Sequence, residues 1–230
     1  MLPTSANMWE YVTVVGLCVI LFVTRYLVSQ SKFHTGTSCV TSLKSIQVDD
    51  LPDVDVNSLR GTVVKQKGLA VTGTRFSESD LNRLLPDVMS YLRAPEFLSR
   101  VHELIGFVPV STLIFGRLYE KEDHIDWHYD QNLTTGRKYT GILNVHIPEC
   151  NTSHFEFREP CSGDVKRPTQ TQGTLFVYPG NKIFHHVTKQ IDDDCTRFVI
   201  IFGFSESRQR SLRQHVLHRM DMVAQKVWAY

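Results

Sequence analysis

The sequence predicts a mainly β domain with flanking helices, an α+β chain whose core is a jelly roll. Short runs of β-branched and aromatic residues follow one another from about residue 110 to residue 204, separated by charged or Gly-containing turns. Before them, between residues 77 and 106, apolar residues recur at helical spacing. A nearly continuous apolar run close to the N terminus predicts a transmembrane helix ahead of the domain.

These observations divide the chain into four parts. They are a membrane anchor (1–28), a linker or stalk rich in Ser, Thr and Asp (29–57), the main domain with its supporting helices (58–205) and a C-terminal amphipathic helix (206–230). In the anchor, residues 11–28 read YVTVVGLCVILFVTRYLV. At helical rise this run is about 27 Å long, close to the hydrocarbon thickness of a bilayer.

Two other interpretations of the N-terminal run are a cleaved signal peptide and a buried core helix. The segment before the run has no positive residue, and the run is longer than the apolar core of a usual signal peptide. A retained membrane anchor is therefore favoured.

The first helices of the main domain follow a recognisable start signal. Ser77-x-x-Asp80 resembles a capping box, with Asp in the place of Glu or Gln. Apolar residues then continue at helical spacing through Leu81, Leu84, Leu85, Val88 and Leu92. Pro95 opens a second helix, and Gly106 ends it.

Most of the strands are expected after Gly106. A short strand pair is predicted within 61–73, and longer strands are predicted at 110–119, after the charged turn 120–123, and at 138–147, 153–158, 173–178, 183–188 and 196–204. The tail then carries apolar residues at spacings of three and four, namely Leu212, Val216, Met220, Val223 and Val227. This pattern predicts an amphipathic helix that packs outside the sheets or pairs with another subunit.

Composition narrows the classes of function. The chain has 25 Lys and Arg against 24 Asp and Glu. It therefore lacks the excess of basic residues that would indicate nucleic acid as a partner. Five cysteines without a C-x-x-C pair argue against a disulfide scaffold and against a structural zinc site.

The candidate chemistry starts at His128-x-Asp130. In an extended strand, residues i and i+2 point to the same face, so an imidazole and a carboxylate are directed to one point. That pair is two thirds of the 2-His-1-carboxylate set that holds non-haem Fe(II) and leaves coordination positions open. The same spacing also occurs at His124-x-Asp126, so the motif alone is weak.

A third ligand and a cation follow downstream. Residues 184–187 read Phe-His-His-Val, and Arg197 begins an apolar run. Strand alternation places His185 on the same face as Val187 and His186 on the opposite face, so only one of the two can face the H-x-D pair. An inward-facing Arg in such a run needs an anionic partner, and a guanidinium can take a carboxylate with two parallel hydrogen bonds.

Taken together, the order H-x-D, H-x-V and Arg resembles the 2-oxoglutarate- and Fe(II)-dependent oxygenases, most closely their prolyl 4-hydroxylase-like branch. The resemblance covers roughly residues 76–204. It includes Tyr119 before the ligand strand, Arg137-x-x-Thr140 on the strand after it, and the run 173–178 before the second histidine. Tyr119 and Arg137 stand at the family's distances from His128 and Asp130 but not from the earlier H-x-D pair.

The resemblance implies a double-stranded β-helix core of the jelly-roll or cupin-like kind. It implies Fe(II) bound by His128, Asp130 and His185, with His186 as the alternative, and 2-oxoglutarate anchored by Arg197. L-ascorbate is the expected reductant. The implied reaction is hydroxylation of a C–H bond by O₂, with a protein or peptide side chain such as proline as substrate and succinate and CO₂ as co-products.

Further contacts with the co-substrate are assigned to Tyr119, Asn144 and Thr140. Related hydroxylases often place a Tyr on the strand after the H-x-D motif, whereas this chain has Asn144 there. An Asn side chain can still donate a hydrogen bond to a carboxylate.

Two competing functions stay open. An AlkB-like nucleic-acid demethylase would have a second Arg six residues after Arg197, but residue 203 is Gly and the net charge is near neutral. A cupin-like binding protein without catalysis is the other alternative, and the intact ligand set with Arg197 counts against it.

The side of the membrane is predicted from conflicting signals. Arg25 and Lys32 follow the anchor, so the positive-inside rule places the domain in the cytosol. The glycosylation sequons at Asn132 and Asn151 are usable only in a secretory lumen. In a lumen, Cys150 and Cys161 could also close a loop. The family resemblance favours a single-pass protein of the endoplasmic reticulum with a lumenal domain, and the cytosolic orientation stays open.

Overall fold

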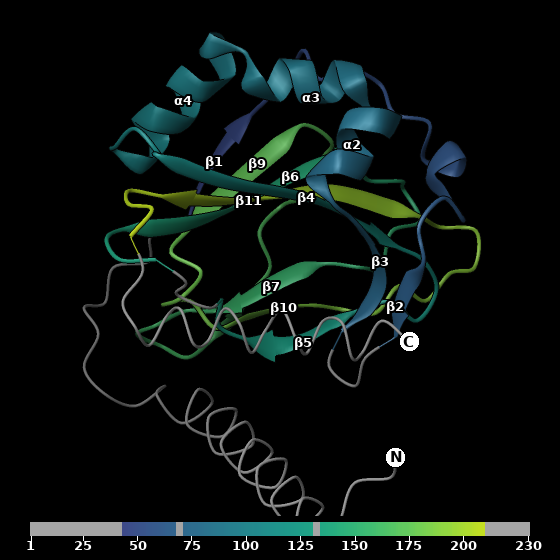
Figure 1. Cartoon of the computed structure of the whole chain (residues 1–230). Helices are drawn as coiled ribbons and strands as arrows, with labels where there is room; N and C mark the ends of the chain where they lie inside the picture. The colour runs from purple at the N-terminus through teal and green to yellow at the C-terminus, as the bar shows by residue number, and fades with distance from the viewer. Residues whose placement is uncertain (1–42, 68–70, 131–133, 210–230) are drawn as a thin grey trace, which may run out of the picture. The chain divides into compact units, whose positions relative to one another are not determined.

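The computed structural model describes residues 43–67, 71–130 and 134–209, and within them the protein is mainly antiparallel β-structure with three short α helices. Figure 1 shows two sheets that face each other, as in a jelly roll. No helix within these ranges is long and apolar enough to span a bilayer. The predicted anchor and most of the predicted C-terminal helix lie outside the described residues.

The larger sheet has seven strands in the order β1-β9-β6-β11-β4-β3-β2. Their bounds are Lys44–Gln47 (β1), Thr174–Tyr178 (β9), Lys138–His146 (β6), Arg197–Ser205 (β11), Ser111–Tyr119 (β4), Thr72–Phe76 (β3) and Lys65–Lys67 (β2). The central strands are largely apolar because both of their faces are covered. In β9, for example, all five residues are buried.

The smaller sheet has four strands in the order β5-β10-β7-β8, with bounds Ile125–His128, His185–Val187, Phe155–Arg158 and Val165–Lys166. Along β7, buried Phe155 and Phe157 alternate with partly exposed Glu156 and Arg158, as expected for a strand with one face in the core. The space between the sheets is filled by a cluster that includes Tyr119, Ile142, Phe155, Tyr178 and Val199.

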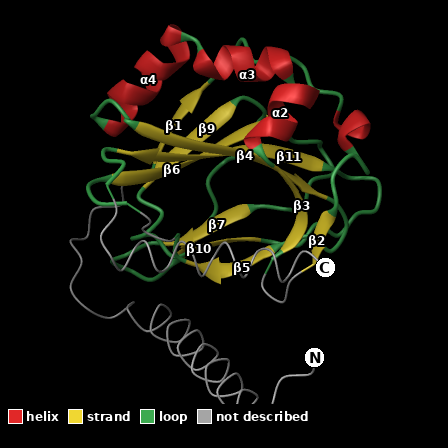
Figure 2. Ribbon diagram, in the orientation of Figure 1, coloured by secondary structure: helices red, strands yellow, loops and turns green. Residues whose placement is uncertain are grey.

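Helices α2 (Glu78–Leu84), α3 (Pro86–Arg93) and α4 (Pro95–Ile105) cover the outer face of the larger sheet, as Figure 2 shows. The capping box forms as predicted, because Asp80 N–H donates to the Ser77 hydroxyl and Ser77 N–H donates to the Asp80 carboxylate. Gly106 ends α4 in the left-handed conformation, with φ of 74°. The buried residues of these helices pack on the outer face of the larger sheet and do not belong to the cluster between the sheets.

The single helix expected from Ser77 to Leu92 is wrong. The chain breaks at Leu85, which has φ of −133° and ψ of 56°, and Pro86 starts a new helix. Proline has no N–H and clashes with the preceding turn, so it interrupts a helix even where the apolar spacing continues.

The linker predicted at 29–57 is also too long. Residues 44–47 pair with β9 as β1, and the 3₁₀ helix η2 (Val56–Leu59) buries Val56 and Leu59. The short strand β8 was not predicted. In addition, the H-x-D strand ends at His128, so Asp130 lies just beyond β5.

Candidate metal centre

His128, Asp130 and His185 converge at one end of the smaller sheet. His128 ends β5 and is the direct cross-strand partner of His185, the first residue of β10, and the centroids of their rings are 4.3 Å apart. The Oδ1 atom of Asp130 lies 3.6 Å from Nε2 of His128 and 3.6 Å from Nε2 of His185. Within the described part of the chain, this is the one group of three such residues close enough to share a metal ion.

Hydrogen bonds around these residues leave the metal-facing atoms available. Nδ1 of His128 lies 2.7 Å from the Asp126 carbonyl, and Nδ1 of His185 lies 2.8 Å from the Ile183 carbonyl. A carbonyl only accepts, so each Nδ1 carries the proton and each Nε2 keeps a lone pair. Such partners fix the tautomer and orientation of metal-binding histidines.

The carboxylate is held in the same way. The Thr140 hydroxyl, on β6, donates to Oδ2 of Asp130 and leaves Oδ1 for a metal. The backbone N–H of Asp130 donates to the Gly180 carbonyl at 3.0 Å, which fixes the chain just past the end of β5. Thr140, predicted as a co-substrate contact, therefore orients the carboxylate in this structure.

The electrostatics of the three residues favour a bound cation. Burial opposes ionisation of Asp130, but the charges of His185 and His128 outweigh it and hold the pKa of Asp130 well below its ordinary value. Desolvation lowers the pKa of His128, yet the Asp130 carboxylate outweighs it and leaves the pKa raised. Asp130 is therefore a carboxylate at neutral pH, a negative charge that a bound cation can neutralise.

The site is closed on one side and open on the other. The His185 side chain is 4% exposed, whereas those of His128 and Asp130 are 34% and 32% exposed. Three ligands on one face with an open opposite face fit a 2-His-1-carboxylate site for Fe(II), which keeps positions for other ligands.

The other residues considered as metal ligands from the sequence, His186, His124 and Asp126, lie outside this cluster. His186 points to the other face of β10, where its Nε2 is 2.8 Å from Oε2 of Glu156 and its ring stacks on Trp127 at 3.9 Å. His124 lies 3.7 Å from Asp126, but its Nδ1 is 3.0 Å from the Thr72 hydroxyl, and neither residue belongs to the cluster of three.

Arg197 lies deep between the sheets and is only 1% exposed. Its Nη1 donates to the Ser153 carbonyl and its Nη2 donates to Oδ1 of Asn144, both at 3.1 Å. Its Nε and the Ser153 hydroxyl are buried and have no hydrogen-bond partner among the described residues. Burial lowers the pKa of Arg197 to about 10, so the guanidinium stays charged at neutral pH. A buried cation with an unused donor suits a carboxylate ligand.

The other predicted contacts surround Arg197. The Tyr119 ring is 5.5 Å from the guanidinium carbon of Arg197, and the two residues are cross-strand partners. Asn144 is fully buried, and while its Oδ1 accepts from Arg197, its Nδ2 donates to the Thr174 carbonyl at 3.3 Å. Asn144 therefore positions Arg197, with both ends of its amide already engaged.

The fold of this chain matches solved structures, although its sequence matches none of the known families. No protein-family model and no curated protein sequence matches the chain. A prolyl hydroxylase from Trichoplax adhaerens, in complex with a hypoxia inducible factor peptide fragment, matches with a TM-score of 0.55 at 12% identity, over 77% of this chain and 87% of that one. HygX from Streptomyces hygroscopicus, with nickel, 2-oxoglutarate and hygromycin B bound, gives 0.54 at 10% identity, over 73% and 84%.

A prolyl-4-hydroxylase from Pseudomonas putida gives a TM-score of 0.50 at 13% identity, over 74% of this chain and 94% of that one. The fold is that of the 2-oxoglutarate and Fe(II) oxygenases. In this oxygenase fold the chain carries two histidines and an aspartate together, and a buried arginine between the same two sheets.

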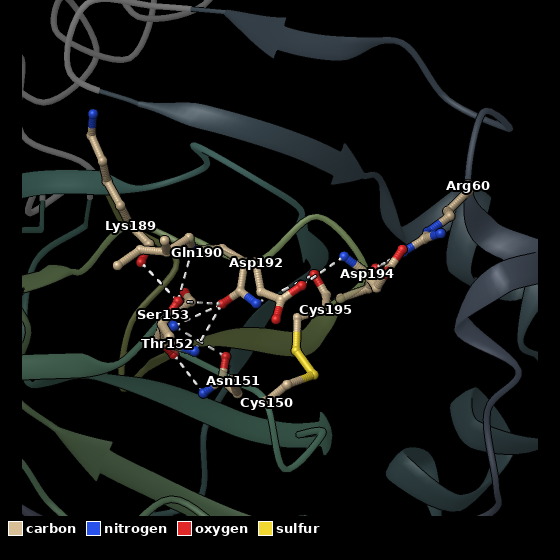
Figure 3. Close-up of a disulfide and its surroundings, with 12 residues drawn as sticks. Arg60, Cys150, Asn151, Thr152, Ser153, Lys189, Gln190, Asp192, Asp194 and Cys195 are labelled. Carbon is tan, nitrogen blue, oxygen red and sulfur yellow. Dashed lines mark hydrogen bonds between the residues drawn. A yellow bond between two sulfur atoms is a disulfide. The ribbon is translucent and has the colours of Figure 1, made fainter.

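A disulfide joins the two loops that lie next to Arg197. Cys150 is bonded to Cys195, as Figure 3 shows, and not to Cys161, the partner considered from the sequence. Cys195 stands two residues before Arg197, and Cys150 stands three before Ser153. Between them, the fully buried Gln190 accepts from the N–H groups of Thr152 and Ser153 and donates to the Cys195 carbonyl. The two loops are thus joined around the guanidinium.

Gly180, between β9 and β10, is a site residue that the sequence did not reveal. A Cβ at this position would overlap Oδ2 of Asp130 and the Thr140 hydroxyl, and it would lie 2.7 Å from Cγ of Asp130. Only Gly permits this approach. In the sequence, Pro-Gly-Asn looks like an ordinary turn, and nothing local links it to Asp130.

Proposed function

We propose that this protein is a 2-oxoglutarate- and Fe(II)-dependent dioxygenase that hydroxylates a C–H bond. The observation that carries the proposal is the convergence of two Nε2 atoms and one carboxylate oxygen within 4.8 Å of one another, each with its other polar atom already engaged. The oxygenase fold and the buried arginine support the same conclusion.

His128, Asp130 and His185 would hold Fe(II), and the unused Nε–H of Arg197 would pair with the far carboxylate of 2-oxoglutarate. Held by these residues, Fe(II) would supply the chemistry that couples oxidation of 2-oxoglutarate to succinate and CO₂ with insertion of one oxygen atom of O₂ into a C–H bond. Asn144 and Ser153 orient the guanidinium, and Thr140 keeps Oδ1 of Asp130 directed to the metal. L-ascorbate is the proposed reductant that keeps the iron ferrous.

The proposed substrate is a side chain of a protein or peptide, with proline first. Two of the matching structures are prolyl hydroxylases, one of them in complex with a peptide fragment. HygX in complex with hygromycin B keeps a small molecule as the alternative substrate class. The near-neutral charge of the chain disfavours a nucleic acid and hence the AlkB-like demethylase. The intact ligand set disfavours a cupin-like binding protein without catalysis.

We further propose a single-pass membrane protein of the endoplasmic reticulum, anchored by residues 11–28, with the catalytic domain in the lumen. The Cys150–Cys195 disulfide supports a lumenal domain, since disulfides persist in oxidising compartments. Pairing of subunits through the 206–230 segment is part of this proposal. A glycosidase-sensitive mass shift that is lost in Asn151→Gln would support the lumenal orientation. Digestion of the catalytic domain by protease in sealed microsomes would place it in the cytosol.

The experiment that tests the enzymatic proposal is formation of succinate by the full chain in detergent with Fe(II), 2-oxoglutarate and ascorbate, with and without proline peptides. The expected result is slow turnover without peptide and faster turnover with a substrate peptide. His185→Ala serves as the inactive control. If the wild-type protein neither binds nor consumes 2-oxoglutarate, the protein is not an oxygenase of this kind.

A further inference from the structure

Arg117, on β4, is a buried cation that has no partner among the described residues. The residue is 8% exposed, and its Nη1 is fully buried with no hydrogen-bond partner in the described part of the chain. Arg60, Arg93, Arg137, Arg167 and Arg197 all make hydrogen bonds, whereas the Arg117 side chain makes no hydrogen bond or ion pair with any residue that the structure describes. A buried charge that lacks a partner is costly, so it indicates a ligand that completes the site.

The carboxylate of Asp123, which lies close to Gly73 as Arg117 does, does not fill this role. Asp123 is 1% exposed, but its Oδ1 binds Nζ of Lys65 at 2.8 Å and its Oδ2 accepts from the N–H of Glu120 at 2.9 Å. Gly73, on the neighbouring strand β3, lies beside Arg117 and has no side chain, and a Cβ there would lie 3.2 Å from the Leu118 carbonyl oxygen. A Cβ there would lie 3.8 Å from Nη1 of Arg117, and no side chain occupies that position.

Arg117 faces the space between the two sheets. It stands two residues before Tyr119 on β4, so both side chains project from the same face of the larger sheet. Its cross-strand partner on β11 is Val199, and both Tyr119 and Val199 belong to the cluster between the sheets. Its positive charge acts on Tyr119 and on His128, which places it within electrostatic range of the metal ligands.

Arg117 and Arg197 occupy different rows of this face. Arg197 pairs with Tyr119 and Arg117 pairs with Val199, so the two rows are about 7 Å apart along the strands. Arg197 already provides the cation for the far carboxylate of 2-oxoglutarate. The Arg117 guanidinium lies in another row, near His128, whose side chain is one third exposed, so it is available to bind a second anion.

We propose that Arg117 binds a carboxylate of the substrate beside the carbon that is oxidised, and so selects acidic substrates. This inference rests on the proposed oxygenase function. A guanidinium matches a carboxylate with two parallel hydrogen bonds, which gives both affinity and orientation. The carboxylate could belong to an acidic side chain next to the target residue or to the C terminus of a chain.

Two matched pairs of proline tetrapeptides separate these sources. One pair differs in Glu or Gln next to proline, and the other differs in a free or an amidated C terminus. Their dissociation constants are measured by calorimetry on the full chain in detergent, loaded with Mn(II) and 2-oxoglutarate without O₂. We expect the wild type to prefer the carboxylate member of one pair by about 10-fold to 150-fold, as for a bidentate charge-assisted contact.

Arg117→Met is the test variant, because methionine fills a similar volume without charge. It should abolish the preference, leave the affinities for Mn(II) and 2-oxoglutarate unchanged, and not lower the unfolding temperature, since no native hydrogen bond is lost. Arg158→Met, which removes a guanidinium 5.1 Å from Trp127, is the matched control and should keep the preference.

Three results would overturn the proposal. The first is a wild type without a preference in either pair, including a wild type that binds none of the peptides. The second is weaker 2-oxoglutarate binding in Arg117→Met, which would assign Arg117 to the co-substrate. The third is a large fall in the unfolding temperature with the preference retained, which would make Arg117 structural. Failure of the wild type to bind 2-oxoglutarate is a different result, because it rejects the oxygenase function itself.

Discussion

The two ends of the space between the sheets are built differently. At the Arg197 end, the Arg197 side chain is 1% exposed and donates hydrogen bonds to the Ser153 carbonyl and to the Asn144 side chain. A disulfide joins the loops around it. At the metal end, two of the three ligands are about one third exposed, and the chain leaves β5 immediately after His128. One end is enclosed and cross-linked, and the other is open.

This difference separates two requirements of the proposed reaction. A co-substrate that is the same in every turnover can be met by a fixed, dehydrated cation. A substrate must enter and leave, so the metal needs an exposed side with free positions. Arg117, which has no partner in the described part of the chain, lies between these regions, which agrees with a role in recognising what enters from the open side.

The largest effect should come from removing a metal ligand. His185→Ala is expected to weaken metal binding by more than about 100-fold, because loss of a residue that merely orients a ligand already costs about 10-fold to 100-fold. The measurement is a calorimetric titration with Mn(II). His186→Ala is the matched control on the same strand, since that ring pairs with Glu156 and stacks on Trp127. Loss of binding in His186→Ala alone would mean that the strand faces the other way.

The next effect tests the enclosed end. Arg197→Ala should raise the apparent KM for 2-oxoglutarate by about 10-fold to 150-fold, which corresponds to about 1.5–3 kcal/mol for a lost charge-assisted contact. Metal affinity should stay unchanged, because Arg197 donates its hydrogen bonds to Ser153 and Asn144 and to none of the three metal-binding residues. Arg197→Lys keeps the charge but loses the planar fork, so its KM should be intermediate. A variant with normal KM would place the anchor elsewhere.

Gly180→Ala tests how tightly the metal end is packed on its closed side. The added Cβ would overlap Oδ2 of Asp130 and would displace the carboxylate, so metal affinity should fall by about 10-fold to 100-fold. The KM for 2-oxoglutarate should change less than in Arg197→Ala. Lys182→Ala, an exposed change in the same turn, is the control. Unchanged metal affinity in Gly180→Ala would mean that the turn moves aside freely.

Local spacing explains which parts of the site could be predicted from the sequence. His128 and Asp130 are two residues apart, and the choice of His185 over His186 needs only the H-x-V pattern of the resembling family and the alternation of a strand. The structure places His185, and not His186, beside Asp130. The start of α2 was predictable for the same reason, because the capping box lies within four residues.

Features that depend on distant parts of the chain were missed. The strand β1 looked like linker because its partner β9 lies about 130 residues later, with Lys44 opposite Val177. The pairing of Cys150 with Cys195 follows from the approach of two loops that are 45 residues apart, whereas Cys161 is nearer in sequence. Gly180 became a site residue only because β10 brings its turn next to Asp130.

The smallest effect on function should come from breaking the Cys150–Cys195 disulfide. A cross-link over 45 residues contributes about 2–4 kcal/mol to the free energy of unfolding, so Cys150→Ser/Cys195→Ser should unfold at a lower temperature. Because Arg197 keeps its bonds to Ser153 and Asn144, the KM for 2-oxoglutarate should rise only a few-fold, and Mn(II) affinity should not change. Reduction of the wild type with dithiothreitol should raise its KM to the value of the double variant, and the variant's own KM should not respond. If breaking this bond weakened metal binding as much as 2-oxoglutarate binding, the two ends of the site would not be independent.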